Sequence, residues 1–425
     1  MTDAGNPPGA DNVRPATDSE PATGSEPQPA AESRPAAESH RSMTAELQRT
    51  LDSAGSAVAR AAATDLAQGV GRAALIFVAT VLAALVLAAP LIIAAGSDPI
   101  TAYGALYDGS LAGQRPFAET LVSMTPLLFG GLAVAIAFHS GLFNIGVEGQ
   151  LVAGGIAAGV VGIHMSTWAP VHVLLSLLAG AAAGALWALV PAALKAWRGV
   201  HEVITTIMMN FVAFSVSQFL VKPGGALEGE IPTGTEPVQS TAELPRIWDP
   251  TRLHLGIVVA LIVAAACWYF IYRTPGGYRF RLVGANPVAA RFNGISSNRV
   301  IVEAMLLSGA LGGLTGAVEV LGTHRRFLDS FSPGYGFDSI AVALLGALHP
   351  VGVAAASFFF GLLRAGSTQL QLEADITRDM ITVISGLVVA CVAARLLLSR
   401  RAARLGRGQG RGAGLEVGTR LGQGD

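Results

Sequence analysis

Residues Ala73–Ala95 read AALIFVATVLAALVLAAPLIIAA, an apolar run without a single charged side chain. A helix needs about 20 such residues to cross a hydrocarbon core about 30 Å thick, so this run is long enough to span a bilayer. The whole chain has 52% hydrophobic and 13% charged residues, whereas a soluble domain carries about 25% charged residues. The run and the composition together predict an integral membrane protein.

Further apolar runs follow along the chain, several of them shorter than a simple span. They are Leu121–Phe138, Gly149–His164, Val171–Leu194, Val203–Val221, Leu255–Tyr272, Val300–Leu321, Ile340–Leu348 with flanking residues, Val351–Ala365 and Ile376–Leu398. We therefore expect an all-α fold, a polytopic transmembrane helical bundle of about ten spans. The short, glycine-rich stretches 149–162 and 337–366 suit interior helices that line a pathway, because irregular backbone is tolerated only away from lipid. Ordinary close packing through small residues, as at Gly180–Gly184, is the alternative for any single glycine.

The two ends of the chain differ from the bundle. Residues 1–60 are rich in Pro, Ser and Glu without apolar periodicity, which predicts a disordered cytoplasmic tail. Residues 61–398 form the predicted transmembrane domain. Residues 399–425 form a basic, glycine-rich cytoplasmic tail; a topology anchor suffices to explain it, and binding of anionic membrane lipid is the alternative.

Basic residues near the span ends predict the orientation, because cytoplasmic loops carry an excess of Lys and Arg. These residues gather before the first run, in the connection 273–299 and after residue 398, whereas the loop 222–254 is acidic. Both termini are therefore expected in the cytoplasm, with the chain in the plasma membrane. Arg325 and Arg326 fit least well, since they fall on the opposite side.

A polar string, HSGLFNIGVEGQ at residues 139–150, separates two apolar runs. It places Asn144, Glu148 and Gln150 at or near membrane depth, where polar and ionisable residues are costly and are candidates for function. Glu148 has a second reading, as a helix-terminus carboxylate that accepts hydrogen bonds from free N–H groups at the start of the next helix. The sequence favours neither the role in transport nor the role at a helix terminus for Glu148.

Two further strings carry polar residues into apolar segments. HEVITTIMMN at residues 201–210 contains Thr206 and Asn210 on one helix face, where they line a pathway or join two helices by hydrogen bonds. GYGFDSI at residues 334–340 contains Phe337 and Asp338. The pairs Phe143-Asn144 and Phe337-Asp338 each precede a small-residue apolar segment, a weak internal repeat of the kind that places substrate at a repeat interface.

The connection 273–299 contains the string GANPVAARFNG. Asn286 suits an N-cap, Pro287 the first helical position and Gly294 a C-terminal stop, so Pro287–Asn293 should form a short helix. We interpret this capped helix as a docking element for a partner, with a plain structured loop as the alternative.

Several function classes lack support. The chain has no phosphate-binding GxxxxGK[ST] loop, no HExxH and no GxSxG string, so we expect no enzyme, no catalytic residue, no metal site and no cofactor in this chain. Cys267 and Cys391 lie in apolar runs and are interpreted as small hydrophobic residues. A net charge of −1 provides no field that would recruit nucleic acid.

Four strings in order, GLFNIGVEGQLVAGGIAAG, HEVITTIMMNF, TPGGYRFRLVGANPVAARFNGI and GFDSIAVALLGALHPVGVAAASFFFGLLRAG, resemble permease subunits of ABC importers. The resemblance is to the branched-chain amino acid and simple-sugar permease family, in its nucleoside-type branch, and it covers about Ala73–Leu398. His349-Pro350 departs from the more polar turn, such as Asn-Asn-Pro, that the family often shows.

The resemblance implies a partner set and a mechanism. The partners are a separate ABC ATPase subunit that binds ATP and Mg, a second permease protomer, an extracytoplasmic solute-binding lipoprotein and a small-molecule solute. The mechanism is alternating access driven by ATP in the partner chain. The implied coupling helix falls at about 286–294, and the residues assigned to this loop are Gly284, Asn286, Pro287, Ala290, Arg291 and Gly294. The residues assigned to the solute pathway are Asn144, Glu148, Gln150, Asn210, Phe337 and Asp338.

The substrate stays open between a nucleoside, which the sub-family resemblance favours, and a simple sugar or a branched-chain amino acid. An ion-coupled secondary carrier, which would use Glu148 and Asp338 for protons or sodium, is a less favoured reading because it leaves the capped helix without a role. A membrane scaffold leaves the polar strings at membrane depth unexplained.

Overall fold

The structure is a computed structural model that describes residues 75, 77–374, 383, 386, 387 and 390. The two expected tails, 1–60 and 399–425, lie outside the described residues, as does nearly all of the expected span Ile376–Leu398. Within the described part of the chain the secondary structure is helical, with two isolated bridges in loops and no strand. The all-α fold class is confirmed.

Eight described helices are long and apolar enough to cross a membrane. They are Phe77–Ala94, α3 (Gln114–His139), α4 (Val147–His164), α5 (Ala169–Arg198), α6 (Glu202–Val221), α7 (Gly256–Arg273), α10 (Ser297–Val318) with its π-helical extension η1 (Glu319–His324), and α12 (Pro350–Ala374). Four shorter helices complete this part: α2 (Pro99–Ser110), α8 (Pro275–Ala285), α9 (Pro287–Phe292) and α11 (Tyr335–Leu345). α11 corresponds to the expected crossing Ile340–Leu348 but begins five residues earlier.

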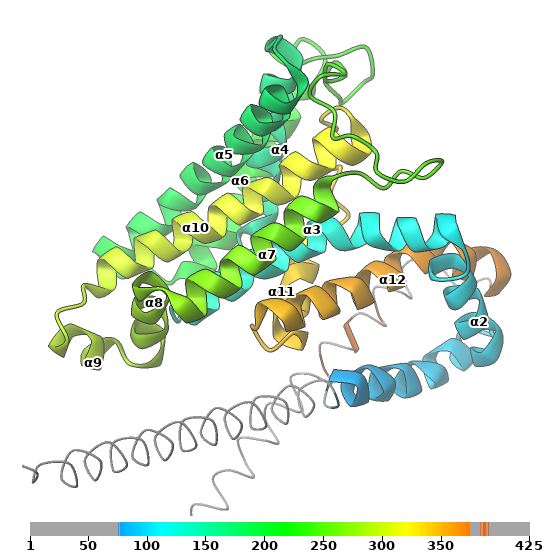
Figure 1. Cartoon of the computed structure of the whole chain (residues 1–425), viewed down its shortest axis with the longest axis horizontal. Helices are drawn as coiled ribbons and strands as arrows, with labels where there is room; N and C mark the ends of the chain where they lie inside the picture. The colour runs from blue at the N-terminus through cyan, green and yellow to red at the C-terminus, as the bar shows by residue number, and fades with distance from the viewer. Residues whose placement is uncertain (1–74, 76, 375–382, 384–385, 388–389, 391–425) are drawn as a thin grey trace, which may run out of the picture. The chain divides into compact units, whose positions relative to one another are not determined.

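Glycines bring α4, α5 and α10 into backbone contact, and the three helices run alongside one another (Figure 1). A Cβ added at Gly184 would lie 2.2 Å from the carbonyl oxygen of Gly309, and one at Gly313 would lie 2.1 Å from that of Gly180. Such close approach is the usual role of small residues in membrane helices. The expected contact through Gly180–Gly184 is therefore confirmed, with α10 as the partner.

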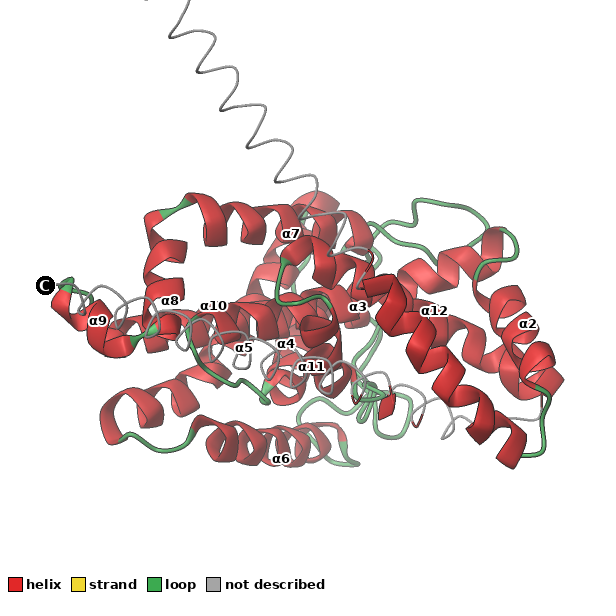
Figure 2. Ribbon diagram, turned by 90° about the horizontal axis from the view of Figure 1, so that it is seen from below, coloured by secondary structure: helices red, strands yellow, loops and turns green. Residues whose placement is uncertain are grey.

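α3 is the most enclosed of the candidate spans: 83% of the residues in its apolar 18-residue stretch are buried, against 22% in the corresponding stretch of α6. It packs against α10, α11 and α12, and α2 lies beside α12. Seen from below, α6 and α7 lie on opposite sides of α4 and α10 (Figure 2). The exposed faces of α6 and α7 are apolar, as lipid-facing surfaces require.

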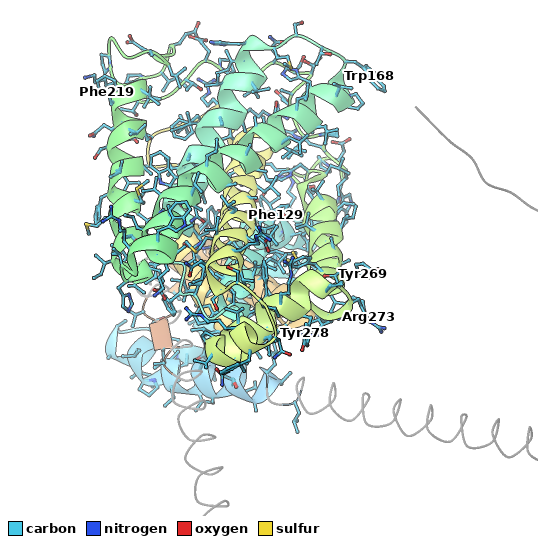
Figure 3. All side chains as sticks on the ribbon, turned by 90° about the vertical axis from the view of Figure 1, so that its left-hand side faces the viewer. Phe129, Trp168, Phe219, Tyr269, Arg273 and Tyr278 are labelled. Atoms are coloured by element: carbon cyan, nitrogen blue, oxygen red, sulfur yellow. The ribbon has the colours of Figure 1, made fainter. Side chains whose placement is uncertain are left out.

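Exposed aromatic residues, accompanied at one end by Arg273, lie toward the two ends of the bundle (Figure 3). Trp168 and Phe219 lie at one end and are exposed, whereas Tyr269, Arg273 and Tyr278 lie toward the other, and Phe129 is enclosed between them. Exposed aromatic rings are typical of the two membrane–water interfaces. Their positions therefore frame the part of the bundle that meets lipid.

The acidic loop 222–254 lies at the end of the bundle away from α8 and α9 (Figure 1). Arg325, which fits the charge rule poorly, forms an ion pair with Glu243 in this loop, with 3.1 Å between Nε and Oε2. The acidic partner neutralises Arg325, which explains how a basic residue is accommodated on this side.

Candidate functional site

The chain turns back into the bundle after α3. Gly141 takes a positive φ of 79°, which glycine adopts without strain, and residues 140–146 then run back along α3. Ser308 of α10 links this stretch to α3. Its hydroxyl donates to the carbonyl of Ala133 at 2.7 Å and accepts from Nδ2 of Asn144 at 2.8 Å. Ala133 precedes the end of α3 by six residues, about 9 Å along the helix. α4 therefore begins inside the bundle rather than at its edge.

Asn144, Gln150 and Asn210 hold this turn in place, and each is at most 1% exposed. Asn144 and Gln150 exchange hydrogen bonds between their amide groups at 3.1 and 3.2 Å, and Oδ1 of Asn144 also accepts from the N–H of Gly146. Asn210 of α6 donates to the carbonyl of Ile145 and accepts from a backbone N–H of α4 at 2.8 Å. The interrupted backbone is thus satisfied by side chains, as non-helical backbone at membrane depth requires.

α11 begins opposite the start of α4. Oε2 of Glu148 accepts from the N–H of Gly336 at 2.6 Å, so the carboxylate lies at the first turns of both helices. A Cβ at Gly336 would lie 2.4 Å from the backbone N of Glu148, so only glycine permits this approach. Glu148 therefore caps the N-terminus of α11, 188 positions away, and not the next helix along the chain as its second expected reading had it. A solute contact stays a prediction.

Asp338 has a basic partner that the sequence interpretation did not include. Nη2 of Arg364 in α12 donates to Oδ2 of Asp338 at 2.5 Å and to the carbonyl of Pro333 at 3.2 Å. The guanidinium also lies over the ring of Tyr335, 4.6 Å from its centroid. Phe337 of the same helix turns away and is 47% exposed. The start of α11 is thus held by a carboxylate from α4 and by an arginine from α12.

The structure brings together most of the expected pathway residues. Asn144, Glu148, Gln150 and Asn210 lie around the start of α4, and Asp338 joins them through α11, whereas Phe337 lies apart. Two helix N-termini, which carry partial positive charge, converge on this point with carboxylates beside them. The arrangement can present backbone N–H groups, amides and carboxylates to a polar solute if the helices separate. Contact with solute by these six residues stays a prediction.

Three polar residues, of which Glu319 and Ser308 are buried and Arg364 is partly buried, were missed from the sequence. Arg364 and Glu319 each stand in an otherwise apolar segment, the signal that marks an intramembrane ionisable residue. Glu319 is 1% exposed, and its Oε2 lies 3.5 Å from Nε2 of His324. Ser308 carries no such signal, because a serine between glycines and leucines reads as ordinary small-residue packing.

The short helix in the connection 273–299 is present, as α9. Oδ1 of Asn286 accepts from the N–H groups of Val288 and Ala289 at 3.0 and 3.1 Å, and Gly294 follows the helix with a φ of 73°. These are the expected N-cap and C-terminal stop. Pro287 opens the helix, Ala290 is its buried residue, and Arg291 is exposed.

α9 presents apolar side chains to solvent: Val288 is 62% and Phe292 89% exposed. The preceding helix α8 touches the turn after α3, since a Cβ at Gly284 would lie 2.3 Å from the carbonyl oxygen of His139 and 2.9 Å from the N of Gly141. α8 therefore connects the exposed helix α9 to the turn that leads to Asn144.

Comparison with known proteins adds a family and relatives. Residues 117–393 match the family described as branched-chain amino acid transport system / permease component. The guanosine ABC transporter permease protein NupP of Bacillus subtilis is 38% identical over 308 residues, which cover 71% of this chain and 88% of NupP.

Two further relatives match over similar lengths. The glucose ABC transporter permease protein TsgB13 of Haloferax volcanii is 35% identical over 73% of this chain and 85% of its own length. The nucleoside ABC transporter permease protein NupB of Lactococcus lactis subsp. cremoris is 31% identical over 73% of this chain and 88% of its own length. No solved structure matches.

Proposed function

The chain belongs to the branched-chain amino acid transport system / permease component family, and from this premise we propose that it moves a nucleoside across the plasma membrane by alternating access. It is a membrane-spanning permease subunit of an ABC transporter, a transport protein rather than an enzyme. ATP hydrolysis belongs to a separate ATPase chain. A second permease protomer and an extracytoplasmic solute-binding lipoprotein complete the proposed assembly.

The contact between Glu148 and Gly336 at 2.6 Å carries the proposal of alternating access. It joins the N-termini of α4 and α11, two helices that begin inside the bundle. Discontinuous helices of this kind line substrate sites in many transporters, because their free N–H groups and the loops before them can move while the long helices stay rigid. Opening on either side then requires that α4 and α11 separate or tilt.

A nucleoside is the proposed substrate because two of the relatives above are named for guanosine and nucleoside transport. A simple sugar is the alternative, supported by the relative named for glucose. A nucleoside needs hydrogen-bond partners for its ribose and base, and Asn144, Glu148, Gln150, Asn210 and Asp338 are the proposed partners. Phe337, the exposed aromatic residue of α11, lies apart from these partners; it would stack on the base only after α11 moves, and ordinary packing is the alternative role.

The docking surface for the ATPase is proposed to be α9 with the end of α8. Its exposed Val288 and Phe292 are large apolar side chains on an otherwise polar loop, the kind of anchor that fills a pocket on a partner. Movement of α8 would reach the start of α4 through Gly284 and Gly141. This orientation puts α8, α9 and both termini in the cytoplasm.

The test is reconstitution into proteoliposomes. The chain alone should show neither ATPase activity nor uptake of guanosine. With its ATPase, its second permease and its binding lipoprotein it should take up guanosine in an ATP-dependent manner, and guanosine should stimulate hydrolysis. Uptake of glucose instead of guanosine would select the sugar alternative. Uptake by the lone chain under a proton or sodium gradient would contradict the proposal and indicate an ion-coupled carrier.

A further inference from the structure

An open polar cavity of about 410 Å³ lies at the end of the bundle away from α8 and α9. Small-molecule sites fall in the range of about 300–1,000 Å³. Its walls come from the end of α2, the first turns of α3, the loop before α7 and the outer half of α12, and α2 and α12 lie side by side there (Figure 1). No part of the site described above includes this cavity, apart from Arg364, which lines its floor.

The charged side chains that line the cavity are three arginines, Arg115, Arg252 and Arg364, and two carboxylates, Asp108 and Glu119. Asp338, which does not line the cavity, offsets the remaining positive charge through its ion pair with Arg364. Arg252 donates to both carboxylate oxygens of Glu119, at 2.9 and 2.6 Å.

The rest of the lining includes Ser123, Ser367, Thr368 and Gln369, so hydroxyl and amide groups surround the charges. Because Asp338 offsets the net charge of the lining through Arg364, and hydroxyl and amide groups make up much of the rest, the cavity suits a neutral polar solute better than an anion or a cation.

Arg364 has hydrogen-bonding capacity that the protein does not use. Its Nη2 serves both Asp338 and Pro333, while its Nε is buried and has no partner among the described residues. A buried donor without a partner is costly, about 1–3 kcal/mol, and calls for a specific explanation. A solute hydroxyl that accepts from Nε would satisfy this donor and weaken, without breaking, the ion pair of Arg364 with Asp338.

We propose that this cavity is the outer solute subsite, that it takes a neutral polyhydroxylated small molecule, and that Arg364 links its occupancy to α11. The inference rests on the proposed transport function and deepens it. Arg364 lines the cavity and contacts the start of α11, so a solute that binds Arg364 loosens the contact with Asp338 that holds α11 on the α12 side. The hydrogen bond between Gly336 of α11 and Glu148 then still connects α11 to α4.

The experiment measures protection of a cysteine in the cavity. In the intact complex with Cys267→Ala and Cys391→Ala, Thr368→Cys is modified by a membrane-impermeant methanethiosulfonate reagent. The probe is guanosine, or glucose if the complex takes up glucose. At a solute concentration about ten times the dissociation constant about one site in ten stays free, so modification should slow about tenfold. Guanosine 5′-monophosphate, which carries charge, should protect much less.

Glu230→Cys is the matched control, because Glu230 is exposed in the loop 222–254 and does not line the cavity. Its modification should not change with solute. If Thr368→Cys lost uptake, Ser367→Cys, the neighbouring lining residue, would replace it.

Equal protection by guanosine and its monophosphate, or no protection in a complex that still takes up solute, would overturn the inference. A wild-type complex without any ATP-dependent uptake would instead contradict the proposed function.

Discussion

At the scale of single residues, Glu148 tests whether a hydrogen bond or a charge matters at the start of α11. Glu148→Gln keeps an oxygen for the N–H of Gly336, whereas Glu148→Ala removes it. We expect Glu148→Ala to lower the free energy of unfolding by about 1–3 kcal/mol, because a buried N–H loses its partner. Glu148→Gln should lower it by less.

Thermal unfolding in detergent and uptake in proteoliposomes measure the two effects. Normal stability of Glu148→Gln with lost uptake would show that the charge serves transport, against our expectation that capping is its main role. Equal stability of all three proteins would show that the contact with Gly336 contributes nothing.

The residues around Glu148 also show what a sequence can reveal. Asn144, Gln150 and Asn210 were predicted as polar residues at membrane depth, and the structure places them together. Their hydrogen-bond partners were not predictable, because Glu148 and Gly336 are 188 positions apart and Asn144 and Ser308 are 164 apart. A polar residue in an apolar segment stands out in the sequence because its burial in a membrane is costly. Its hydrogen-bond partner, in contrast, depends on how the helices pack.

At the scale of helices, the contact of α5 with α10 allows a test with a matched control. A Cβ at Gly184 would lie 2.2 Å from the carbonyl oxygen of Gly309, so Gly184→Ala must push the two helices apart. Overpacking of this kind costs about 1–3 kcal/mol. Gly104 in α2 has no atom within 4 Å of an added Cβ, so Gly104→Ala should leave stability unchanged or raise it through better helix propensity.

The melting temperatures of the two alanine variants in detergent provide the comparison. A Gly184→Ala protein as stable as Gly104→Ala would mean that the backbone contact between α5 and α10 is not needed.

The capped helix α9 allows a second test at this scale. Asn286→Ala removes the side-chain acceptor of two N–H groups, a loss of about 1 kcal/mol confined to a short exposed helix. We expect solute-stimulated ATPase activity of the complex to fall while the melting temperature of the permease stays the same. Asn286→Ser, which keeps a capping oxygen, should restore most of the activity. Full activity of Asn286→Ala would argue that the shape of α9 plays no part in coupling.

Helix ends mark the limit of prediction from sequence at this scale. α9 was predicted within one residue because its cap, proline and glycine are local signals. The crossing at α11 was predicted only as Ile340–Leu348 with flanking residues, and the sequence did not show that the helix begins at Tyr335, because Glu148 and Arg364 from distant helices hold its first turn. The expected crossing at Ile376–Leu398 lies outside the described residues.

At the scale of the whole molecule, stability should depend on pH through His254. The ring is 1% exposed between Gly256 and Gly322, and burial lowers the pKa of His254 below its ordinary value of 6.5, with Glu319 opposing the shift only in part. The unfolded chain therefore binds a proton more readily than the folded one. Stability should be full above about pH 6.5 and should fall as the pH drops toward the lower folded pKa.

Melting temperatures at several pH values between 7.5 and 5 measure this dependence, and His254→Asn should reduce its slope. An unchanged slope in His254→Asn would assign the pH dependence to other groups.

The meeting of two helix N-termini inside the bundle has a consequence for ions. Each N-terminus carries partial positive charge, and paired half-helices with their positive ends turned to one point repel protons and other cations in narrow channels. A protein that opens a path for a polar solute must still keep the proton and sodium gradients of the cell intact. We therefore expect the starts of α4 and α11 to oppose cation leakage along a path that passes them, and the carboxylates of Glu148 and Asp338 beside these helix ends to lower that barrier.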